Sequence, residues 1–337
     1  MFFAIVYFIL SPANAETEVI NSPPPEMVYP QESVWKSKGG HFPFIYFNEF
    51  INAAVKEEDA HPYWAHTEKE AEELARLVTD NTSLLLNNDI LAYYGHPNSR
   101  NMGILGRYSI EELDKRLKST AEKYKELSGG RDIIRAFYLI YGTAWPGGDI
   151  GYIGDATLQR YIEYALKNDM LVFIDNQIGR FDPINAIRRM LPWLKYPNVH
   201  LALDPEWRTD KPMQEIGHLT AEEINRAQRA MEEYIIANDI PGERMLVIHQ
   251  FNWVMIRNRE NVRSDFRRVR LVHCISGIGT PAMKRDTYAF GARATNMPVK
   301  GFKLWYDFGI SGHTDRPLMS PRDVYNLNPR PYIIMYQ

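Results

Sequence analysis

The sequence predicts a (β/α)8 TIM-type barrel, on three observations. Eight short apolar runs with the character of strands recur through the chain. Segments with helical periodicity lie between them, and such alternation is typical of parallel strands joined by helical crossovers. Acidic, amide and aromatic residues collect where the runs end, which is where such barrels hold their chemistry. A doubly wound open sheet is the alternative, but residues 95–99, after the first run, lack its glycine-rich phosphate-binding pattern.

The predicted elements alternate in chain order. The strands are Ile90–Tyr94, Ile133–Tyr141, Leu171–Asp175, Val199–Asp204, Met245–Gln250, Val269–Ile275, Phe302–Asp307 and Tyr332–Tyr336. The helices between them are Ile110–Leu127, Ala156–Asn168, Ile184–Leu194, Ala221–Asn238, Val254–Phe266, Met283–Thr295 and Pro321–Leu327. An earlier helix, Thr67–Leu77, stands in for the missing final helix.

Several of these helices have recognisable start signals. Three capping boxes are predicted, formed by Thr67 with Glu70, by Ser109 with Glu112 and by Thr220 with Glu223. Residues 182–183, Asp-Pro, place a proline in the first turn of the third helix. These signals fix where the crossovers begin.

The beginning of the chain is typical of a secretion signal. Residues 2–10 form an apolar run too short to span a bilayer, and residues 13–15, Ala-Asn-Ala, fit a cleavage site. We therefore predict a signal peptide over residues 1–15, a linker and irregular arm over 16–59, and the barrel domain over 60–337. The protein is expected to be secreted, periplasmic or attached to the cell surface.

Composition narrows the classes of partner. The net charge of −3 offers no basic surface for nucleic acid, and no further stretch has the length and apolar character of a membrane span. The single cysteine, Cys274, excludes an internal disulfide and lies in an apolar run, so it is predicted to be core. We expect no cofactor and no metal, while the oligomeric state stays open.

The chain is organised around residues 199–207, Val-His-Leu-Ala-Leu-Asp-Pro-Glu-Trp. Alternate residues of a strand face the same side, so one face carries His200, Ala202, Asp204 and Glu206 and the other carries Val199, Leu201 and Leu203. Pro205 cannot donate to a strand ladder, so regular pairing should stop there. This stretch places two carboxyl groups at the end of a buried strand.

Glycoside hydrolysis needs one protonated and one ionised carboxyl group. Glu206 is the candidate acid, and Asp204 or Asp175, near Lys303 or Arg135, is the candidate ionised partner. The expected substrate is a polysaccharide or cell-wall glycan. Its predicted contacts are Tyr94, His96, Trp145, Asn176, Gln177, Trp207, His249, Gln250, Lys303, Trp305 and Asp307.

These residues also carry a resemblance to a known group of enzymes. Residues 201–206, Leu-Ala-Leu-Asp-Pro-Glu, with Asp175 ending the preceding strand, resemble the Asp-x-Glu pattern of chitinase-like and muramidase-like barrels. Residues 303–306, Lys-Leu-Trp-Tyr, are similar to their late Trp-containing strand. The resemblance implies Glu206 as the acid and Asp204 as its partner. The fuller chitinase signature Asp-x-x-Asp-x-Asp-x-Glu is absent, so the similarity lies at the level of the superfamily.

Four other interpretations stay open. Arg135, Lys303 and Asp175 would also satisfy a purely structural layer of ion pairs. A desolvated Lys303 suits Schiff-base chemistry. A metal-dependent hydrolase would draw its ligands from His96, His249, Asp175 and Asp204. A non-catalytic glycan-binding barrel would keep its aromatic platforms, Trp145, Trp207, Trp253 and Trp305.

Overall fold

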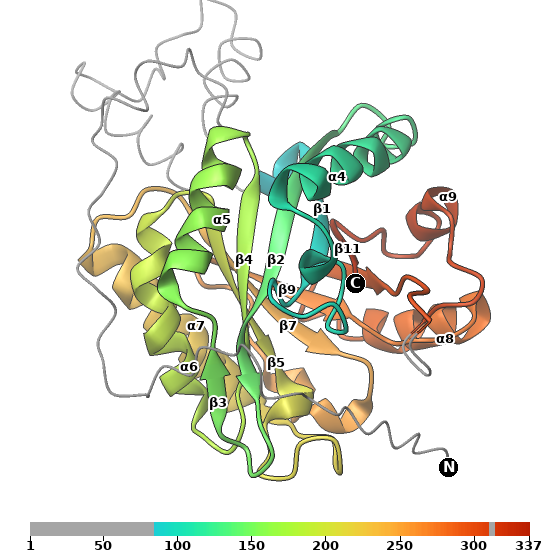
Figure 1. Cartoon of the computed structure of the whole chain (residues 1–337). Helices are drawn as coiled ribbons and strands as arrows, with labels where there is room; N and C mark the ends of the chain where they lie inside the picture. The colour runs from blue at the N-terminus through green and yellow to red at the C-terminus, as the bar shows by residue number, and fades with distance from the viewer. Residues whose placement is uncertain (1–83, 310–313) are drawn as a thin grey trace, which may run out of the picture.

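The protein folds into a closed barrel of eight parallel strands with interleaved helices, so the predicted (β/α)8 architecture is confirmed (Figure 1). The structure is a computed structural model and describes residues 84–309 and 314–337. The barrel strands are β1 (Asn88–Gly95), β2 (Asp132–Ala144), β4 (Leu171–Gln177), β5 (Val199–Asp204), β7 (Arg244–Gln250), β9 (Val269–Ile275), β10 (Lys300–Leu304) and β11 (Ile333–Tyr336). Since β1 pairs in parallel with both β2 and β11, no edge is left and an open sheet is excluded.

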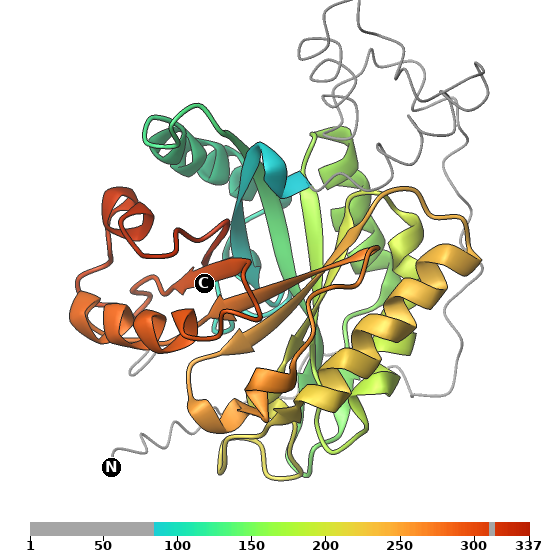
Figure 2. The same ribbon diagram turned by 180° about the vertical axis from the view of Figure 1, so that it is seen from behind.

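Helices cover the outside of the barrel, as the view from behind shows (Figure 2). They are α4 (Ile110–Lys125), α5 (Asp155–Lys167), α6 (Pro183–Met190), α7 (Ala221–Ala237), α8 (Pro281–Ala292) and α9 (Pro321–Tyr325). Short additions are β3 (Ile150–Tyr152), β6 (Leu219–Thr220), β8 (Ile256–Arg257), η2 (Leu84–Leu86), η3 (Leu105–Arg107), η4 (Leu191–Lys195), η5 (Pro205–Trp207), η6 (Trp253–Met255) and η7 (Arg259–Asn261). The 3-10 turn η4 and the hairpin strand β3 extend the predicted pattern without changing it.

One predicted helix is wrong. Residues 254–266 contain η6, β8 and η7 in place of a helix. Asn258 adopts a left-handed conformation with φ of 53°, which a right-handed helix cannot contain. Ile256 pairs instead with Leu219 in the small β6–β8 sheet. Tertiary pairing therefore overrides the helical periodicity of this segment.

Most predicted helix starts are present. Thr220 and Glu223 form a complete capping box at α7, and Asp182 accepts a hydrogen bond from the backbone N–H of Ile184 at the start of α6. Ser109 caps α4 by accepting from the N–H of Glu112 at 3.3 Å. That box is only half formed, because the carboxylate of Glu112 pairs with Arg116 one turn later.

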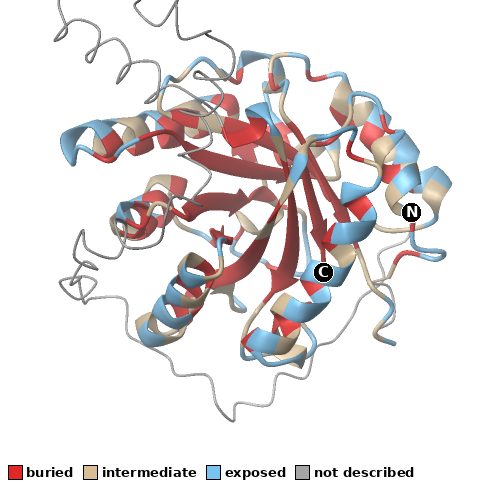
Figure 3. Ribbon diagram, turned by 90° about the horizontal axis from the view of Figure 1, so that it is seen from above, coloured by how far each residue is buried: buried red, intermediate tan, exposed pale blue. Residues whose placement is uncertain are grey.

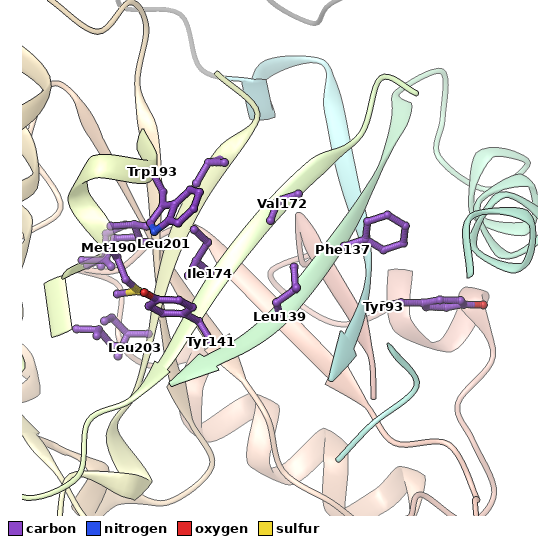
Figure 4. Packing of buried hydrophobic residues seen from close by; sticks show 14 of the residues in the cluster. Tyr93, Phe137, Leu139, Tyr141, Val172, Ile174, Met190, Trp193, Leu201 and Leu203 are labelled. Atoms are coloured by element: carbon purple, nitrogen blue, oxygen red, sulfur yellow. The ribbon is translucent and has the colours of Figure 1, made fainter. Parts of the chain in front are cut away.

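Alternation along the strands separates two buried clusters. On β2, Phe137 and Leu139 face the surrounding helices, whereas Tyr138 and Ile140 face the barrel interior. Figure 4 shows the outward cluster, in which Phe137 and Leu139 lie among the side chains of neighbouring strands. Viewed from above, the strands are buried and the outer sides of the helices are exposed (Figure 3).

The same alternation corrects the prediction for Arg135. This residue shares the outward face of β2, where its guanidinium pairs with Asp114 of α4 and donates to the carbonyl of Asn168 at 3.0 Å. It therefore belongs to the outer side of the barrel wall. An interior ion-pair layer that includes Arg135 is excluded, and so is its role as the cation beside Asp175.

The predicted signal peptide, the irregular arm and the helix Thr67–Leu77 lie outside the described residues. No helix among residues 84–309 and 314–337 combines the length and the apolar character needed to cross a bilayer.

A buried network ties the amino-terminal end of the barrel together. Asp89, 1% exposed, accepts hydrogen bonds from Arg131 at 2.8 Å, from Tyr325 at 2.8 Å and from Arg330. These three partners lie on two different parts of the chain, before β2 and near β11. The carboxylate thus links the first and last strands.

We expect Asp89→Ala to destabilise the protein by about 3–5 kcal/mol, because it leaves two arginines without their buried counter-charge. Urea unfolding measures this loss. Asp265→Ala, which removes an exposed pair with Arg263, is the control and should leave the unfolding midpoint unchanged. Equal effects of the two changes would contradict the assigned role of Asp89.

Candidate active site

Three carboxyl groups meet at the carboxyl ends of two adjacent strands. Asp175 faces inward from β4 and is fully buried, and Asp204 is the last residue of β5 and is 5% exposed. Glu206 follows in the 3-10 turn η5 and is partly exposed. The three groups act on one another electrostatically, since the charge of Asp204 raises the pKa of both Asp175 and Glu206. The structure therefore brings the three predicted catalytic residues together.

A single lysine faces this cluster from the opposite part of the wall. Lys303 lies on β10, is 3% exposed, and extends between two aromatic rings. Its Nζ is 3.6 Å from the ring centroid of Tyr94 and 4.4 Å from that of Trp305. Burial lowers the lysine pKa, while Asp204, Asp175 and Glu206 raise it. The rings and the acids together hold a cation in a site from which water is largely excluded.

Asp175 is the most enclosed of the acids. Tyr94 donates a hydrogen bond to its Oδ2 at 2.8 Å, and Nε2 of His249 lies 3.6 Å from the same oxygen. His249 in turn is hydrogen-bonded to Tyr138 at 2.8 Å. Burial, and then the charge of Asp204, raises the pKa of Asp175 to about 8. Burial and Lys303 hold the pKa of His249 well below its usual range, so this imidazole is neutral.

The other two acids differ in a way that separates their roles. Burial raises the pKa of Glu206 to about 8, with a further increase from Asp204. Burial raises the pKa of Asp204 only to about 6, because Lys303 and hydrogen bonds offset part of the cost. At neutral pH, Asp204 is mostly ionised beside a mostly protonated Glu206. That difference is what acid catalysis with an ionised partner requires.

The backbone around Glu206 is fixed by contacts with neighbouring loops. Its carbonyl accepts from the N–H of Gly217 at 2.7 Å, and the carbonyl of Trp207 accepts from Gly179 at 2.9 Å. The Trp207 side chain also contributes hydrogen bonding to both Asp204 and Glu206. A Cβ on Gly179, whose φ is +65°, would lie 2.1 Å from the carbonyl oxygen of Gly148. Only glycine fits where the three loops meet.

Three further predicted contacts lie at or just after the carboxyl ends of strands, which form the mouth of the barrel. Gln177, on the inward face of β4, accepts from the N–H of Ala144 at 2.9 Å. Trp145 lies in the turn between β2 and β3 with its indole against Gly151. His96 follows β1, and its Nδ1 accepts from the N–H of Asn98 at 3.1 Å. Burial lowers the pKa of His96 to about 4, so it is neutral as well.

Two predicted contacts face elsewhere. Asn176 lies on the outward phase of β4, where a Cβ on Gly142 would approach its side chain to 2.5 Å. Gln250 accepts from Arg259 at 3.1 Å and is hydrogen-bonded to His273, which in turn contacts Lys300. Both side chains therefore lie on the outward face of the barrel wall, away from the inward face that carries Asp175 and Asp204.

The predicted strand Phe302–Asp307, whose alternation would put Lys303, Trp305 and Asp307 on one face, is wrong beyond Leu304. The strand β10 ends at Leu304, so the alternation stops before Trp305 and Asp307. Asp307 forms an ion pair with Arg316 in the following loop. The backbone N–H of Gly309 and the charge of Arg316 lower the pKa of Asp307. Trp305 still reaches the site, since its ring contacts the Lys303 ammonium.

Sequence reasoning missed three buried residues near the mouth: Tyr138, Lys284 and Asp315. Tyr138 is on the inward phase of β2, so the period-two pattern would have found it. Nothing in the sequence pairs Lys284 with Asp315. The prediction that Cys274 is a core residue is confirmed: it is buried on the inward face, and burial raises its pKa to about 12.

The alternative metal site can be compared with the same geometry. Asp175 and His249 are neighbours, whereas His96 bonds within its own loop. In the part of the chain that the structure describes, no group of three or more His, Cys, Asp or Glu side chains could hold a metal ion.

No protein-family model matches the sequence, and no curated protein matches it. Among solved structures the chain is similar to a chitinase from Chromobacterium violaceum, with 9% identity, a TM-score of 0.36, and coverage of 64% of this chain and 68% of that one. It is also similar to a GH138 enzyme targeting pectin rhamnogalacturonan II (11%, TM-score 0.39, 74% and 34%). A third is a GH5 family lichenase from Caldicellulosiruptor sp. F32 (10%, TM-score 0.35, 73% and 83%). At TM-scores below 0.5 this likeness gives no information about the reaction.

We expect Asp175→Asn to stabilise the protein at pH 8. The folded-state pKa of Asp175 is raised to about 8, so between about pH 4 and pH 8 the unfolded chain binds fewer protons and stability falls as pH rises. Asparagine removes that loss and still accepts from Tyr94. The expected gain in unfolding free energy is on the order of 2 kcal/mol at pH 8 and smaller at pH 5.

Urea unfolding at the two pH values measures this difference. Asp286→Asn, on the exposed face of α8, serves as the control and should change neither value. A variant less stable than the wild type at both pH values would show that ionised Asp175 stabilises the fold.

Proposed function

We propose that this protein is a glycoside hydrolase that cleaves a polysaccharide or cell-wall glycan by carboxylate acid/base catalysis. The observation that supports it best is the pairing of Glu206 and Asp204, whose pKa values of about 8 and about 6 lie on opposite sides of neutrality. Two carboxyl groups in unequal environments are what cleavage of a glycosidic bond needs. Secretion through the predicted signal peptide is part of the same proposal.

Each residue has a defined role in the proposed reaction. Glu206 donates its proton to the glycosidic oxygen as the bond between that oxygen and the anomeric carbon breaks. Asp204 either takes a proton from the water that attacks the anomeric carbon or attacks that carbon itself. The anomeric configuration of the first product separates these two routes. Lys303 keeps Asp204 ionised, and the neutral pair of Asp175 and His249 offers hydrogen bonds to the sugar.

Unpaired atoms support a polar ligand at this position. In residues 84–309 and 314–337, Oδ1 of Asp175 and Nδ1 of His249 are buried and have no hydrogen-bond partner. Buried polar atoms without partners are costly, and a sugar hydroxyl can satisfy them. The side chain of Trp207 is hydrogen-bonded to Asp204 and Glu206, and the ring of Trp305 contacts the Lys303 ammonium, so both offer aromatic surface on which a sugar could stack.

The test is cleavage of polysaccharide and peptidoglycan libraries by the wild type and two isosteric variants. Glu206→Gln and Asp204→Asn should each lower kcat by at least about 100-fold, which is typical of losing a general acid or base. Glycan binding should be retained in both. A wild type that binds glycans without cleaving any of them would favour the non-catalytic barrel, and borohydride trapping of a carbonyl ligand on Lys303 would favour Schiff-base chemistry.

We expect kcat/KM to follow a bell-shaped pH profile. Activity should rise as Asp204 loses its proton near pH 6 and fall as Glu206 loses its proton near pH 8. Lys303→Met should move the acidic limb to higher pH, because the cation that favours the ionised form of Asp204 is gone. Initial rates between pH 4 and pH 10 measure both limbs. An acidic limb unmoved by Lys303→Met would show that the lysine does not act on Asp204.

A further inference from the structure

We infer that the buried ion pair between Lys284 and Asp315 is a positioning pair, which fixes the end of β10 and thereby places Lys303 and Trp305 beside the acids. Its consequence for catalysis rests on the proposed glycosidase function. Its consequence for the geometry of the mouth does not.

On the β9 side, strand pairing does not extend to Lys303 and Trp305. The ladder between β9 and β10 ends where Ile275 faces Phe302, one residue before Lys303. On the other side the pairing with β11 includes Lys303, which faces Met335, and it continues as the N–H of Tyr306 donates to the carbonyl of Gln337 at 2.9 Å. The segment that presents Lys303 and Trp305 therefore leaves the sheet along the β9 side. Other contacts have to hold it there.

Lys284 of α8 supplies the first set of contacts. Its Nζ donates to the backbone carbonyl of Lys303 at 2.7 Å and to that of Gly277 at 2.6 Å. It also lies 2.9 Å from Oδ2 of Asp315, and neither side chain of this pair is exposed. The three donors of one ammonium group thus join the loop after β9, the end of β10 and the loop that returns to β11.

Asp315 supplies the second set. Its Oδ2 accepts from the backbone N–H of Trp305 at 2.9 Å, and its Oδ1 accepts from that of Gly279 at 3.0 Å. The N–H of Asp315 donates to the carbonyl of Trp305 at 3.0 Å. The indole of Trp305 is held separately by a hydrogen bond to the carbonyl of Ser276 at 3.2 Å. The ammonium group of Lys284 and the carboxylate of Asp315 therefore bond the backbone of β10 on the side where β9 no longer pairs with it.

The position of Lys303 matters because its effect on the acids depends on distance. Lys284 donates to the backbone carbonyl of Lys303, and Asp315 accepts from the backbone N–H of Trp305. A buried ion pair is a poor source of stability, since desolvation offsets most of its attraction, so this pair contributes more to geometry than to stability. Its loss should be felt at the mouth even when the fold survives.

The test compares Lys284→Met, Asp315→Asn and the double variant. Each single change leaves one buried charge unpaired, whereas the double variant removes both, so its Tm should lie above that of either single variant. The double variant should regain stability without restoring the position of Lys303. The double variant should keep at least a tenfold loss of kcat/KM, with its acidic limb moved to higher pH as Lys303 moves away from Asp204.

A readout without catalysis is the rate of reductive methylation of Lys303, measured by peptide mass spectrometry in the intact protein. Lys303 is 3% exposed, and its methylation should be at least five times faster in the double variant than in the wild type. The matched control is Arg270→Met with Glu243→Gln, which removes an ion pair at the amino-terminal ends of β7 and β9. That control should leave both the Lys303 rate and the acidic limb unchanged.

The outcomes separate the two proposals. A double variant with the wild-type methylation rate and the wild-type pH profile would overturn the positioning role. If the wild type cleaves no glycan, the proposed function fails, and the methylation rate still decides the placement of Lys303. Should the double variant not fold, Asp315→Asn alone is subjected to the same two measurements, with the same outcomes for and against.

Discussion

The site depends on one constraint: three carboxyl groups lie together at the carboxyl ends of β4 and β5, two of them buried and Glu206 partly exposed, with Lys303 beside them. Burial raises the pKa of each acid, and the charge of Asp204 raises the pKa of Asp175 and Glu206 further. The three cannot all be ionised at neutral pH without a large cost. Because Lys303 offsets burial most effectively at Asp204, that group ionises first and leaves its neighbours protonated. The site therefore holds an acid and an ionised carboxylate at the same pH.

The barrel makes this arrangement possible by separating apolar from polar layers along its axis. On the inward face of β4 and β5, apolar Phe173 and Ala202 lie before the acids, so the mouth is closed off below by packed side chains. At the amino-terminal side of that layer, His200 accepts from the backbone N–H of Met245 at 3.1 Å and has no part in the mouth. Closure of the sheet removes any edge at which water could enter between strands. Low local polarity is thus inherent in the architecture.

The sequence predicted the strands and the inward acids because period-two alternation is a local property. Asp175 and Asp204 follow buried residues of the same phase, and they are inward. The same rule, applied without a fixed phase, put Arg135 inside, whereas it shares the outward face of Phe137 and pairs with α4. The predicted strand also extended too far: it ended at Asp307, whereas β10 ends three residues earlier, at Leu304. Where a strand stops depends on its neighbours, which a single sequence does not reveal.

Contacts between loops are what alternation cannot predict, and they orient the site. The backbone of Glu206 is held by Gly217, and the end of β10 is held by Asp315 from a loop ten residues further along. Each contact joins two loop segments that are not related by the periodicity of a helix or a strand. The raised pKa values of the acids make the fold less stable as pH rises, whereas the buried Asp89 network joins the chain at the amino-terminal end of the barrel. The proposed chemistry and this buried network thus lie at opposite ends of the barrel.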